Sequence, residues 1–262
     1  RAHDPADAIT FLAPVAYNVK AAAPRWERFL NEIFLWDSEL ITYVQKLVGY
    51  SVTGLNFEQL LVILNGEGAN GKGVFTGTIA ELVGDYARHL SVRSLTTAAS
   101  NDIRADLASL PGSRFIVASE GNQQDQFDEA LVKVLTGEDV IRARFLYQNE
   151  FEFRMTGKVW LQTNHLPRVN GMDWAIWRRL VVIPFNQTVR RSPDSAGEGP
   201  VCNQKLKAQL VEHEASGILN WILEGFRRWQ KEGLGECEAA ERASGAYRER
   251  EDTIRSFVSA RC

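Results

Sequence analysis

The 262-residue chain has few cysteines, no long apolar segment and no strong net charge. Its three cysteines, Cys202, Cys237 and Cys262, lie far apart and form no CxxC pair, so they support neither a disulfide framework nor a zinc site. No apolar run is long enough to span a bilayer, and the first residues show neither a methionine nor a signal-peptide pattern. We therefore expect a cytoplasmic protein, and we interpret the chain as a segment of a longer one.

The net charge of −3 and the pI near 5.9 argue against a protein that coats nucleic acid without selectivity. The charge is unevenly distributed, however. The segment from Leu131 to Leu180 contains eight basic and five acidic residues. A protein that guides one strand needs positive charge only along the path of that strand, so the acidic balance does not exclude DNA as a partner.

Hydrophobic periodicity predicts helices towards both ends of the chain. Apolar residues at helical spacing within Trp26–Tyr50 predict two helices, with an N-cap at Asp37 and a stop at Gly49. A further short helix is expected at Phe57–Leu60. Helical spacing returns over Leu206–Phe257.

The middle of the chain alternates between short apolar runs and helical segments. The runs have the length and composition of buried strands. They are Leu61–Leu64, Arg114–Ala118, Val159–Thr163 and Leu180–Ile183, and a helix is expected at Val74–Val83. This alternation predicts an α/β domain with a largely parallel sheet.

A glycine-rich segment, Gly66–Gly73, follows the first predicted strand and fits the pattern GxxxxGK. Glycines let the backbone wrap around phosphates, amide groups at a helix N-terminus bind the anion, and Lys72 adds a positive charge. A chance glycine-rich turn is the alternative, but the strand before it and the helix after it favour a nucleotide site. The expected contacts are Gly66, Gly68, Asn70, Gly71, Lys72, Gly73 and Val74.

The glycine-rich segment lacks the hydroxyl side chain that usually binds magnesium in such a loop. The position after Lys72, which usually carries a serine or threonine hydroxyl, is Gly73, so water or another residue must hold the ion. The second predicted strand ends in Ser119 and Glu120, 48 residues after Lys72. We interpret Glu120 as the catalytic base that orients or activates water, and Ser119 with Glu120 as the candidate magnesium contacts.

Three further polar residues stand where phosphoryl transfer would use them. Asn164 follows the third predicted strand and could contact the γ-phosphate or the attacking water; a strand-ending turn residue is the alternative. Arg178 and Arg179 follow, and a guanidinium supplied across a subunit boundary stabilises charge in phosphoryl transfer. Of the two, Arg179 is slightly favoured; a surface pair is the alternative.

Taken together, these motifs resemble the superfamily 3 helicase domain, and more closely the C-terminal half of primase–helicases of phages, satellite phages and integrated plasmids. The resemblance covers about residues 25–257. The supporting segments are Gly66–Phe75, Asp106–Leu110, Ser119–Glu120, Leu135–Asp139, Ala143–Tyr147, Thr163–Pro167 and Asp173–Arg179, with Leu47–Tyr50 and Gly217–Trp221 as flanks.

The resemblance implies an AAA+-like core that binds ATP and Mg²⁺ and acts as a ring, usually a hexamer, on single-stranded or forked DNA. It also implies a primase domain upstream and a phage- or mobile-element-encoded protein in a bacterial cytoplasm. The expected parts are a linker (1–23), a helical oligomerisation segment (24–58), the ATPase core (59–187) and a C-terminal helical segment (188–262).

The same resemblance implies a hairpin that reaches into the channel of the ring. Ile141–Tyr147 and Phe151–Phe153 alternate like two strands, with Arg142 and Arg144 on one face and Phe145 and Tyr147 on the other. The tip carries Gln148 where the family would have a lysine. The expected DNA contacts are Arg142, Arg144, Tyr147 and Gln148; aromatic packing into the core is the alternative.

Two other functions remain open from the sequence. A small-molecule kinase would use the same phosphate loop, but it gives no role to the helical flanks or the hairpin. A DNA-binding or assembly module that binds ATP without turning it over is favoured by Gly73 and by the lack of a second acid beside Glu120.

Overall fold

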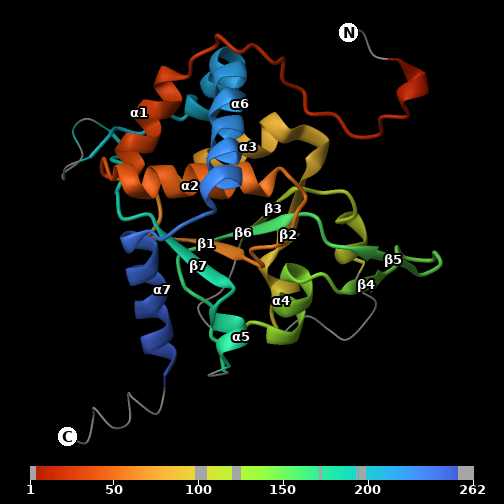
Figure 1. Ribbon diagram of the computed structural model, residues 1–262. Helices are drawn as coiled ribbons and strands as arrows, with labels where there is room; N and C mark the ends of the chain where they lie inside the picture. Colours follow the sequence, from red (N-terminus) through yellow and green to blue (C-terminus); the bar gives the residue numbers. More distant parts are fainter. Residues whose placement is uncertain are drawn as a thin grey trace, which may run out of the picture.

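The centre of the molecule is a five-stranded parallel sheet (Figure 1). The computed structural model describes residues 4–97, 105–119, 125–170, 173–192, 194 and 199–252. The strands lie in the order β2 (Ala87–Ser91), β3 (Phe115–Ser119), β6 (Lys158–Thr163), β1 (Leu61–Asn65) and β7 (Leu180–Pro184). Every neighbouring pair in this sheet is parallel. The predicted α/β fold with a largely parallel sheet, flanked by helices, is confirmed.

Helices cover both faces of the sheet, because its central strands are apolar on both sides. On β1, Val62 and Leu64 belong to one hydrophobic core, and Leu61 and Ile63 belong to the other. The first core is closed by α1 (Pro24–Ile33), α2 (Ser38–Ser51), α3 (Lys72–Val83) and α6 (Leu206–Glu232), which lie above the sheet in Figure 1. The second includes residues of α4 (Glu129–Thr136), α5 (Trp174–Trp177) and α7 (Glu238–Glu251).

The four predicted strands are present, but the sequence pattern does not predict β2. Its sequence includes Arg88 and His89, and only Leu90 of its five residues is buried. An edge strand with one covered face does not need an apolar run, so the pattern that identifies the central strands is missing here. Short 3-10 turns complete the fold at Pro5–Asp7, Gly84–Tyr86, Val92–Leu95 and Leu107–Ser109.

The N-terminal helices follow the prediction in part. The side chain of Asp37 accepts a hydrogen bond from the Leu40 amide and caps α2 as expected. The predicted stop at Gly49 is wrong, since α2 continues to Ser51. A Cβ at Gly49 would lie 2.0 Å from the backbone nitrogen of Phe226, so this glycine is required by the close approach of α2 and α6.

The predicted helix at Phe57–Leu60 is also wrong, because the segment forms a turn that leads into β1. Phe57 is exposed, and Gln59 adopts a positive φ of 53°, which a helix does not allow. The connection from α2 to β1 is therefore held by its side chains rather than by helical hydrogen bonds.

The C-terminal helical segment consists of two helices. Gly233 ends α6 with a φ of 70°, and α7 then runs along the edge strand β7. The Ser244 hydroxyl accepts a hydrogen bond from the Val182 amide at 3.0 Å, which satisfies part of the exposed edge of the sheet. The predicted end of this helical region, at residues 253–257, lies outside the described residues. Within the part of the chain that the structure describes, no helix is long and apolar enough to cross a membrane.

Candidate functional site

The glycine-rich segment forms a loop between the carboxyl end of β1 and the first turn of α3. Gly71 precedes α3 with a φ of 91°, a conformation that a residue with a side chain rarely adopts. Asn70 is buried, and its amide donates a hydrogen bond to the Phe185 carbonyl at 3.2 Å. A Cβ at Gly66 would lie 2.3 Å from that same carbonyl oxygen. The conformation of the loop therefore depends on its glycines and on the hydrogen bond of the buried Asn70.

Lys72 is the first residue of α3 and is only 7% exposed. Its ammonium donates hydrogen bonds to the Gly66 carbonyl and, at 3.1 Å, to the Asn164 side-chain oxygen. Burial lowers the pKa of Lys72 to about 8, because the charged form loses solvation. An anion at the loop would restore the favourable surroundings of the charged ammonium, so the site is suited to phosphate.

Lys72 and Asn164 were expected at one site, and the structure brings them together. Asn164 directly follows β6, which lies beside β1 in the sheet. The carboxyl ends of neighbouring parallel strands meet at one edge, which is the usual position of a ligand site in such sheets. Asn164 itself is exposed, and its oxygen faces the lysine ammonium.

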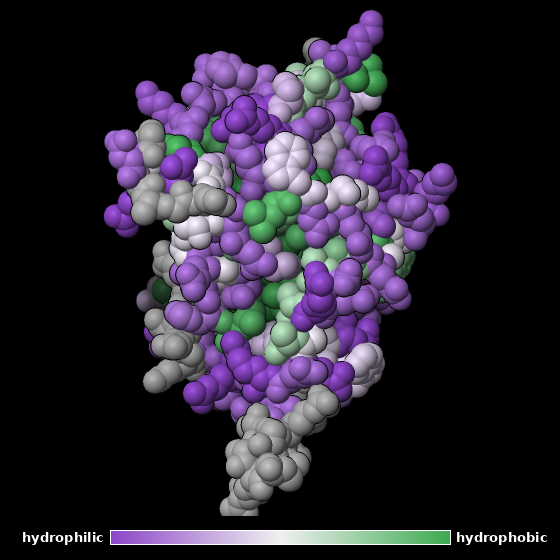
Figure 2. Space-filling view, turned by 90° about the vertical axis from the view of Figure 1, so that its left-hand side faces the viewer, coloured by the Kyte–Doolittle hydropathy of each residue, from purple (hydrophilic) through white to green (hydrophobic). Residues whose placement is uncertain are grey.

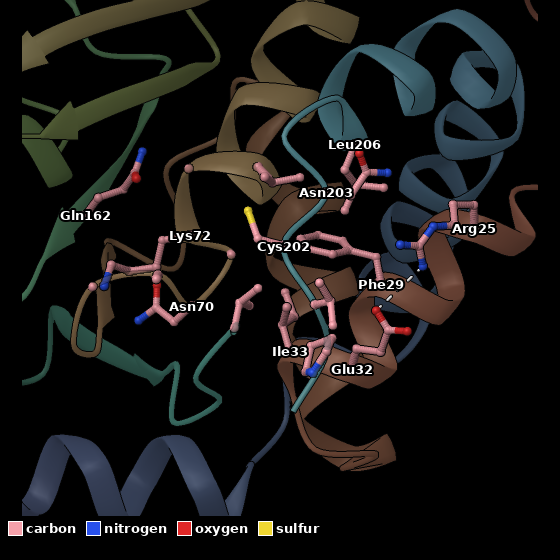
Figure 3. A pocket seen from close by; sticks show the side chains of 18 of the residues that line it. Arg25, Phe29, Glu32, Ile33, Asn70, Lys72, Gln162, Cys202, Asn203 and Leu206 are labelled. Carbon is pink, nitrogen blue, oxygen red and sulfur yellow. Dashed lines mark ion pairs between the residues drawn. The ribbon is translucent and has the colours of Figure 1, made fainter. Parts of the chain in front are cut away.

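A cavity of about 470 Å³ opens beside this loop. Figure 3 shows Asn70 and Lys72 on one side of it, with Phe29 and Ile33 of α1 on the other. Val201 and Leu206 add further apolar surface. Figure 2, viewed from the side of α1 and α7, shows apolar residues recessed among hydrophilic ones on this face. The cavity thus combines a polar, glycine-rich loop with an apolar wall.

The α1 residues of this wall were not expected at the site. Arg25 also lines the cavity, and its guanidinium pairs with Glu32 at 3.5 Å (Figure 3). In the sequence these residues belong to an ordinary amphipathic helix, and nothing in that pattern distinguishes a wall of a ligand site from a packing surface.

Of the two candidate magnesium contacts, Ser119 and Glu120, only Ser119 can be placed. Ser119 is the last residue of β3 and lies at the same edge of the sheet as the phosphate loop. Glu120 lies outside the described residues. Among the residues that the structure describes, no group of three His, Cys, Asp or Glu side chains is arranged to hold a metal ion.

Gln162 is a polar residue at the site that the sequence motifs did not single out. It lies on β6, lines the cavity, and donates a hydrogen bond from Nε2 to the Thr76 hydroxyl at 2.7 Å. The sequence contains one indication of this role, which is a single glutamine within the apolar run Val159–Thr163. A polar side chain in a buried strand normally has a hydrogen-bond partner, so its presence indicates a polar contact.

The two arginines lie at the opposite end of the sheet. They directly precede β7, and the Arg179 carbonyl accepts a hydrogen bond from the Leu61 amide at the start of β1. A five-residue strand extends over about 17 Å, so neither guanidinium reaches the phosphate loop of its own chain at the other end of β1.

The two guanidinium groups differ in their surroundings. Arg179 is 9% exposed and donates hydrogen bonds to the Ala175 carbonyl, to the Thr136 hydroxyl at 3.1 Å and to Gln59 at 3.4 Å. Burial and the neighbouring Arg178 lower its pKa, and the ordinary value for arginine is high enough that it remains charged. Arg178 is exposed and donates to the same Gln59 oxygen. Only Arg178 presents its guanidinium at the surface.

The predicted hairpin exists, with shorter strands than expected. Strands β4 (Val140–Ala143) and β5 (Phe151–Arg154) pair antiparallel and project from the side of the molecule (Figure 1). The predicted strand over Ile141–Tyr147 is wrong beyond Ala143, because the chain turns there. The backbone N–H of Gln148 donates a hydrogen bond to the Phe145 carbonyl and closes this turn at the tip.

The four candidate DNA contacts are all on this hairpin, in different surroundings. Arg142 is exposed and forms an ion pair across the hairpin with Glu152 at 2.8 Å. Arg144 is half-buried, and Gln148 is exposed. Tyr147 is 97% exposed with a φ of 62°, which rules out the alternative that this ring packs into the core. Phe145 is also exposed, with its ring stacked 6.1 Å from Phe151.

The connection from α2 to β1 joins the hairpin to the arginine pair. The Asn56 amide donates hydrogen bonds to the Gly137 and Met155 carbonyls, which flank the hairpin strands, at 3.3 and 2.8 Å. Three residues later, Gln59 accepts from both arginines. This polar network was not expected, because its members are separated by tens of residues and carry no local motif.

Comparisons with known proteins extend this description. Residues 64–179 match the model of a family of unknown function, DUF5906. The chain is 27% identical over 232 residues to a "Putative helicase" of Acanthamoeba polyphaga mimivirus, which covers 85% of this chain and 24% of the relative. It is 30% identical over 141 residues to "Putative helicase 022R" of Frog virus 3, covering 52% and 14%. A "Putative primase" of African swine fever virus is 25% identical, with 78% of this chain and 22% of that protein covered.

Among solved structures, the chain is similar to the C-terminal region of NrS-1, with a TM-score of 0.68 and 11% identity. The match covers 92% of this chain and 56% of that one. At this identity the likeness shows a shared fold. The chain spans about a quarter or less of the length of the viral relatives it matches. The chain is thus similar to a part of viral proteins named as putative helicases or primases, and it has the fold of the NrS-1 C-terminal region.

Proposed function

We propose that this chain is the ATP-hydrolysing motor of a DNA helicase, acting in a ring on single-stranded or forked DNA. The main support for this proposal is that the candidate residues are divided between the two ends of the sheet. Lys72 and Asn164 meet at the phosphate loop, whereas Arg178 and Arg179 lie about 17 Å away at the other end of β1. Such a division is productive when the arginine end of one subunit faces the loop end of the next.

In the proposed site, ATP binds in the cavity beside the loop. The loop amides and Lys72 hold the phosphates, and the apolar surface of Phe29, Ile33 and Val201 packs against the base. Asn164 contacts the γ-phosphate or the attacking water, and Glu120 orients or activates that water.

The geometry favours Arg178 over Arg179 as the group that crosses the subunit boundary. Arg178 is exposed, and within the described part of the chain its guanidinium is held by a hydrogen bond to Gln59. Arg179 is buried and bonded to three residues of its own chain, so it positions the turn before β7. Charge developing on the transferred phosphoryl group would then be stabilised by the guanidinium of Arg178 from the neighbouring subunit.

Mg²⁺ is expected at the phosphates, where it would neutralise charge on the β- and γ-oxygens. Oxygen-bearing side chains at this edge of the sheet, such as Ser119 and Gln162, fit the preference of the ion for oxygen. Glu120 remains a candidate ligand from its position after β3.

The hairpin is the proposed contact with DNA. Its exposed Tyr147 offers a ring for base stacking, and Arg142 and Arg144 provide positive charge for phosphates. The parent protein of this chain would be a replication protein with a primase domain upstream, of phage or mobile-element type, acting in the cytoplasm of the host.

Steady-state ATP hydrolysis with and without single-stranded DNA tests this function. We expect turnover that DNA stimulates, and we expect Lys72→Ala to abolish both nucleotide binding and turnover. Lys231→Ala is the matched control, because this lysine is exposed in the last turn of α6, outside the cavity. A Lys72→Ala variant that hydrolyses ATP at the wild-type rate would contradict the loop assignment.

A second function is favoured by one specific observation. Gly73 lacks the hydroxyl that usually binds magnesium, so the chain could instead be a DNA-binding or assembly module that binds ATP without turnover. Wild-type protein that binds ATP, forms rings and never hydrolyses it, with or without DNA, would support this alternative over the motor.

A further inference from the structure

The missing hydroxyl at residue 73 leaves an open space beside the first turn of α3. Apart from its chain neighbours and the backbone of its own helix, a Cβ built on Gly73 would have one described atom within 4 Å, the Gln162 Oε1 atom at 3.9 Å. A serine or threonine hydroxyl at this position would project into the same space. The structure therefore places a side-chain oxygen of β6 next to residue 73, the position where the phosphate loop lacks a hydroxyl oxygen.

The orientation of the Gln162 amide follows from its hydrogen bonds. The buried Thr76 hydroxyl donates its one proton to the Lys72 carbonyl at 3.1 Å. The hydroxyl oxygen is then available to accept a hydrogen bond from the Gln162 Nε2 atom, which lies 2.7 Å away. With the nitrogen bound to Thr76, the oxygen is directed towards Gly73 and the cavity.

Gln162 shares a face of the sheet with the other residues of the site. Trp160, two residues earlier on β6, packs in the core beneath α3, so Gln162 and Asn164 continue the same alternation towards the carboxyl edge. Figure 3 shows Gln162 and Lys72 at the same end of the cavity. Lys72 already binds Asn164, so Gln162 of β6 and Asn164, which directly follows the strand, both lie against the start of α3.

We propose that Gln162 binds the Mg²⁺ ion that accompanies the nucleotide phosphates, supplying through Oε1 the oxygen that residue 73 lacks. This inference rests on the proposed nucleotide site. Mg²⁺ prefers oxygen ligands, and a neutral amide oxygen serves this role without adding charge beside Lys72. The hydrogen bond to Thr76 holds the amide in place, so little side-chain freedom is lost when the ion binds.

A purely structural role for Gln162, as a bond between β6 and α3, is the competing explanation. The two explanations differ in one measurable quantity, the gain in nucleotide affinity that Mg²⁺ produces. A structural residue changes the stability of the fold and affects nucleotide binding equally with and without the ion.

The experiment measures the Kd of a non-hydrolysable ATP analogue in Mg²⁺ and in EDTA for four proteins. These are wild type, Gln162→Met, Gly73→Ser and the double variant. Methionine keeps the length of the side chain without its oxygen, and serine at residue 73 meets no atom closer than an ordinary contact. We expect wild type to gain affinity with Mg²⁺, Gln162→Met to lose roughly tenfold or more of that gain with little change in EDTA, and the double variant to regain it.

The outcomes separate this inference from the proposed function. Wild-type protein that binds the analogue in neither solution contradicts both. Normal binding with the full Mg²⁺ gain retained in Gln162→Met overturns the role of Gln162 and leaves the nucleotide site intact. A lost gain that Gly73→Ser does not restore, in variants with wild-type unfolding midpoints, also overturns it, because the serine hydroxyl would fill the same place.

Discussion

At the carboxyl end of the sheet, the phosphate loop is one continuous segment of the chain, whereas the polar network at the amino end comes from separate segments. The phosphate loop and Lys72 lie within eight consecutive residues, joined by Asn164 from the adjacent strand. At the amino end, Gln59, Thr136 and Arg179 meet through side-chain hydrogen bonds. A local motif shapes the backbone of the first, and packing between distant elements determines the second.

The contrast indicates how the two ends could cooperate. The amino end contains the exposed arginine and, through Asn56, the base of the hairpin. A movement of the hairpin on DNA would act directly on the connection that carries Gln59. At the carboxyl end, Lys72 contacts Gly66 and Asn164 rather than the hairpin, so the response of this end would come from the neighbouring subunit.

The largest expected effect separates Arg178 from Arg179. Arg178→Ala should reduce ATP hydrolysis by about 10³-fold or more while nucleotide affinity remains, because the guanidinium acts on charge that develops during the reaction. Arg179→Ala should instead lower the free energy of unfolding by about 1–3 kcal/mol, because Thr136 and Gln59 lose a buried partner. Hydrolysis rates, nucleotide affinity and chemical denaturation of both variants check this.

Mixing two inactive variants tests whether the arginine acts across a boundary. Lys72→Ala subunits keep Arg178, and Arg178→Ala subunits keep the phosphate loop. Activity should reappear in the mixture if the two groups come from different subunits. A mixture that stays inactive, under conditions where wild-type subunits exchange into rings, would place the arginine in its own subunit and contradict the geometry.

The next effect concerns the link from the hairpin. Asn56→Ala removes both hydrogen bonds to the hairpin base, so DNA should stimulate hydrolysis severalfold less while turnover without DNA stays similar. Asn31→Ala is the control, because its amide makes one exposed hydrogen bond within α1. Equal loss of basal and stimulated rates in Asn56→Ala would assign the residue to stability alone.

The sequence predicted one end of the sheet far better than the other, for physical reasons. A phosphate loop depends on glycines and a lysine at fixed spacing, so Gly66, Gly71 and Lys72 identify themselves. The strands β1, β3, β6 and β7 follow the prediction, because burial requires continuous apolar runs. Spacing does not reveal which of two adjacent side chains is buried, so the sequence does not show that Arg178 is the exposed one of the pair.

Several predictions from the sequence fail for the same reason, because distant elements determine the local structure. Gly49 resembles a helix stop, but α6 requires it for close approach. Phe57 and Gln59 resemble a helical turn, but their neighbours in space hold a different conformation. The edge strand β2 has no apolar run because only one of its residues needs full burial.

A smaller effect should appear in stability, from a buried lysine at the amino end. Lys158, the first residue of β6, is 3% exposed and lies 4.7 Å from the centre of the Tyr50 ring. Burial, with Arg114 nearby, lowers the pKa of Lys158 to about 7. Between pH 7 and 10 the unfolded chain therefore binds more protons than the folded one, so the free energy of unfolding should rise with pH.

Chemical denaturation at pH 7 and pH 9 measures this rise in wild type and in Lys158→Met. The contribution of one lysine is at most about 1.4 kcal/mol per pH unit, and the variant should lose it. Lys72, with its pKa lowered to about 8, contributes in the same direction in both proteins, so the difference between them isolates Lys158. Identical slopes would show that Lys158 keeps its proton in the folded state across this range.

The last effect tests the lysine at the carboxyl end through nucleotide binding. Above pH 8 the free protein holds Lys72 increasingly in its neutral form, whereas bound phosphates favour the charged form. Binding then takes up a proton, so the affinity for a non-hydrolysable ATP analogue should fall between pH 7.5 and 9.5, by at most about tenfold per pH unit. In Lys72→Arg the side chain stays charged, and the affinity, even if weaker, should not depend on pH in this range. A flat wild-type profile would mean that the ammonium stays protonated without a ligand, and the contacts to Gly66 and Asn164 would then stabilise its charge more than burial opposes it.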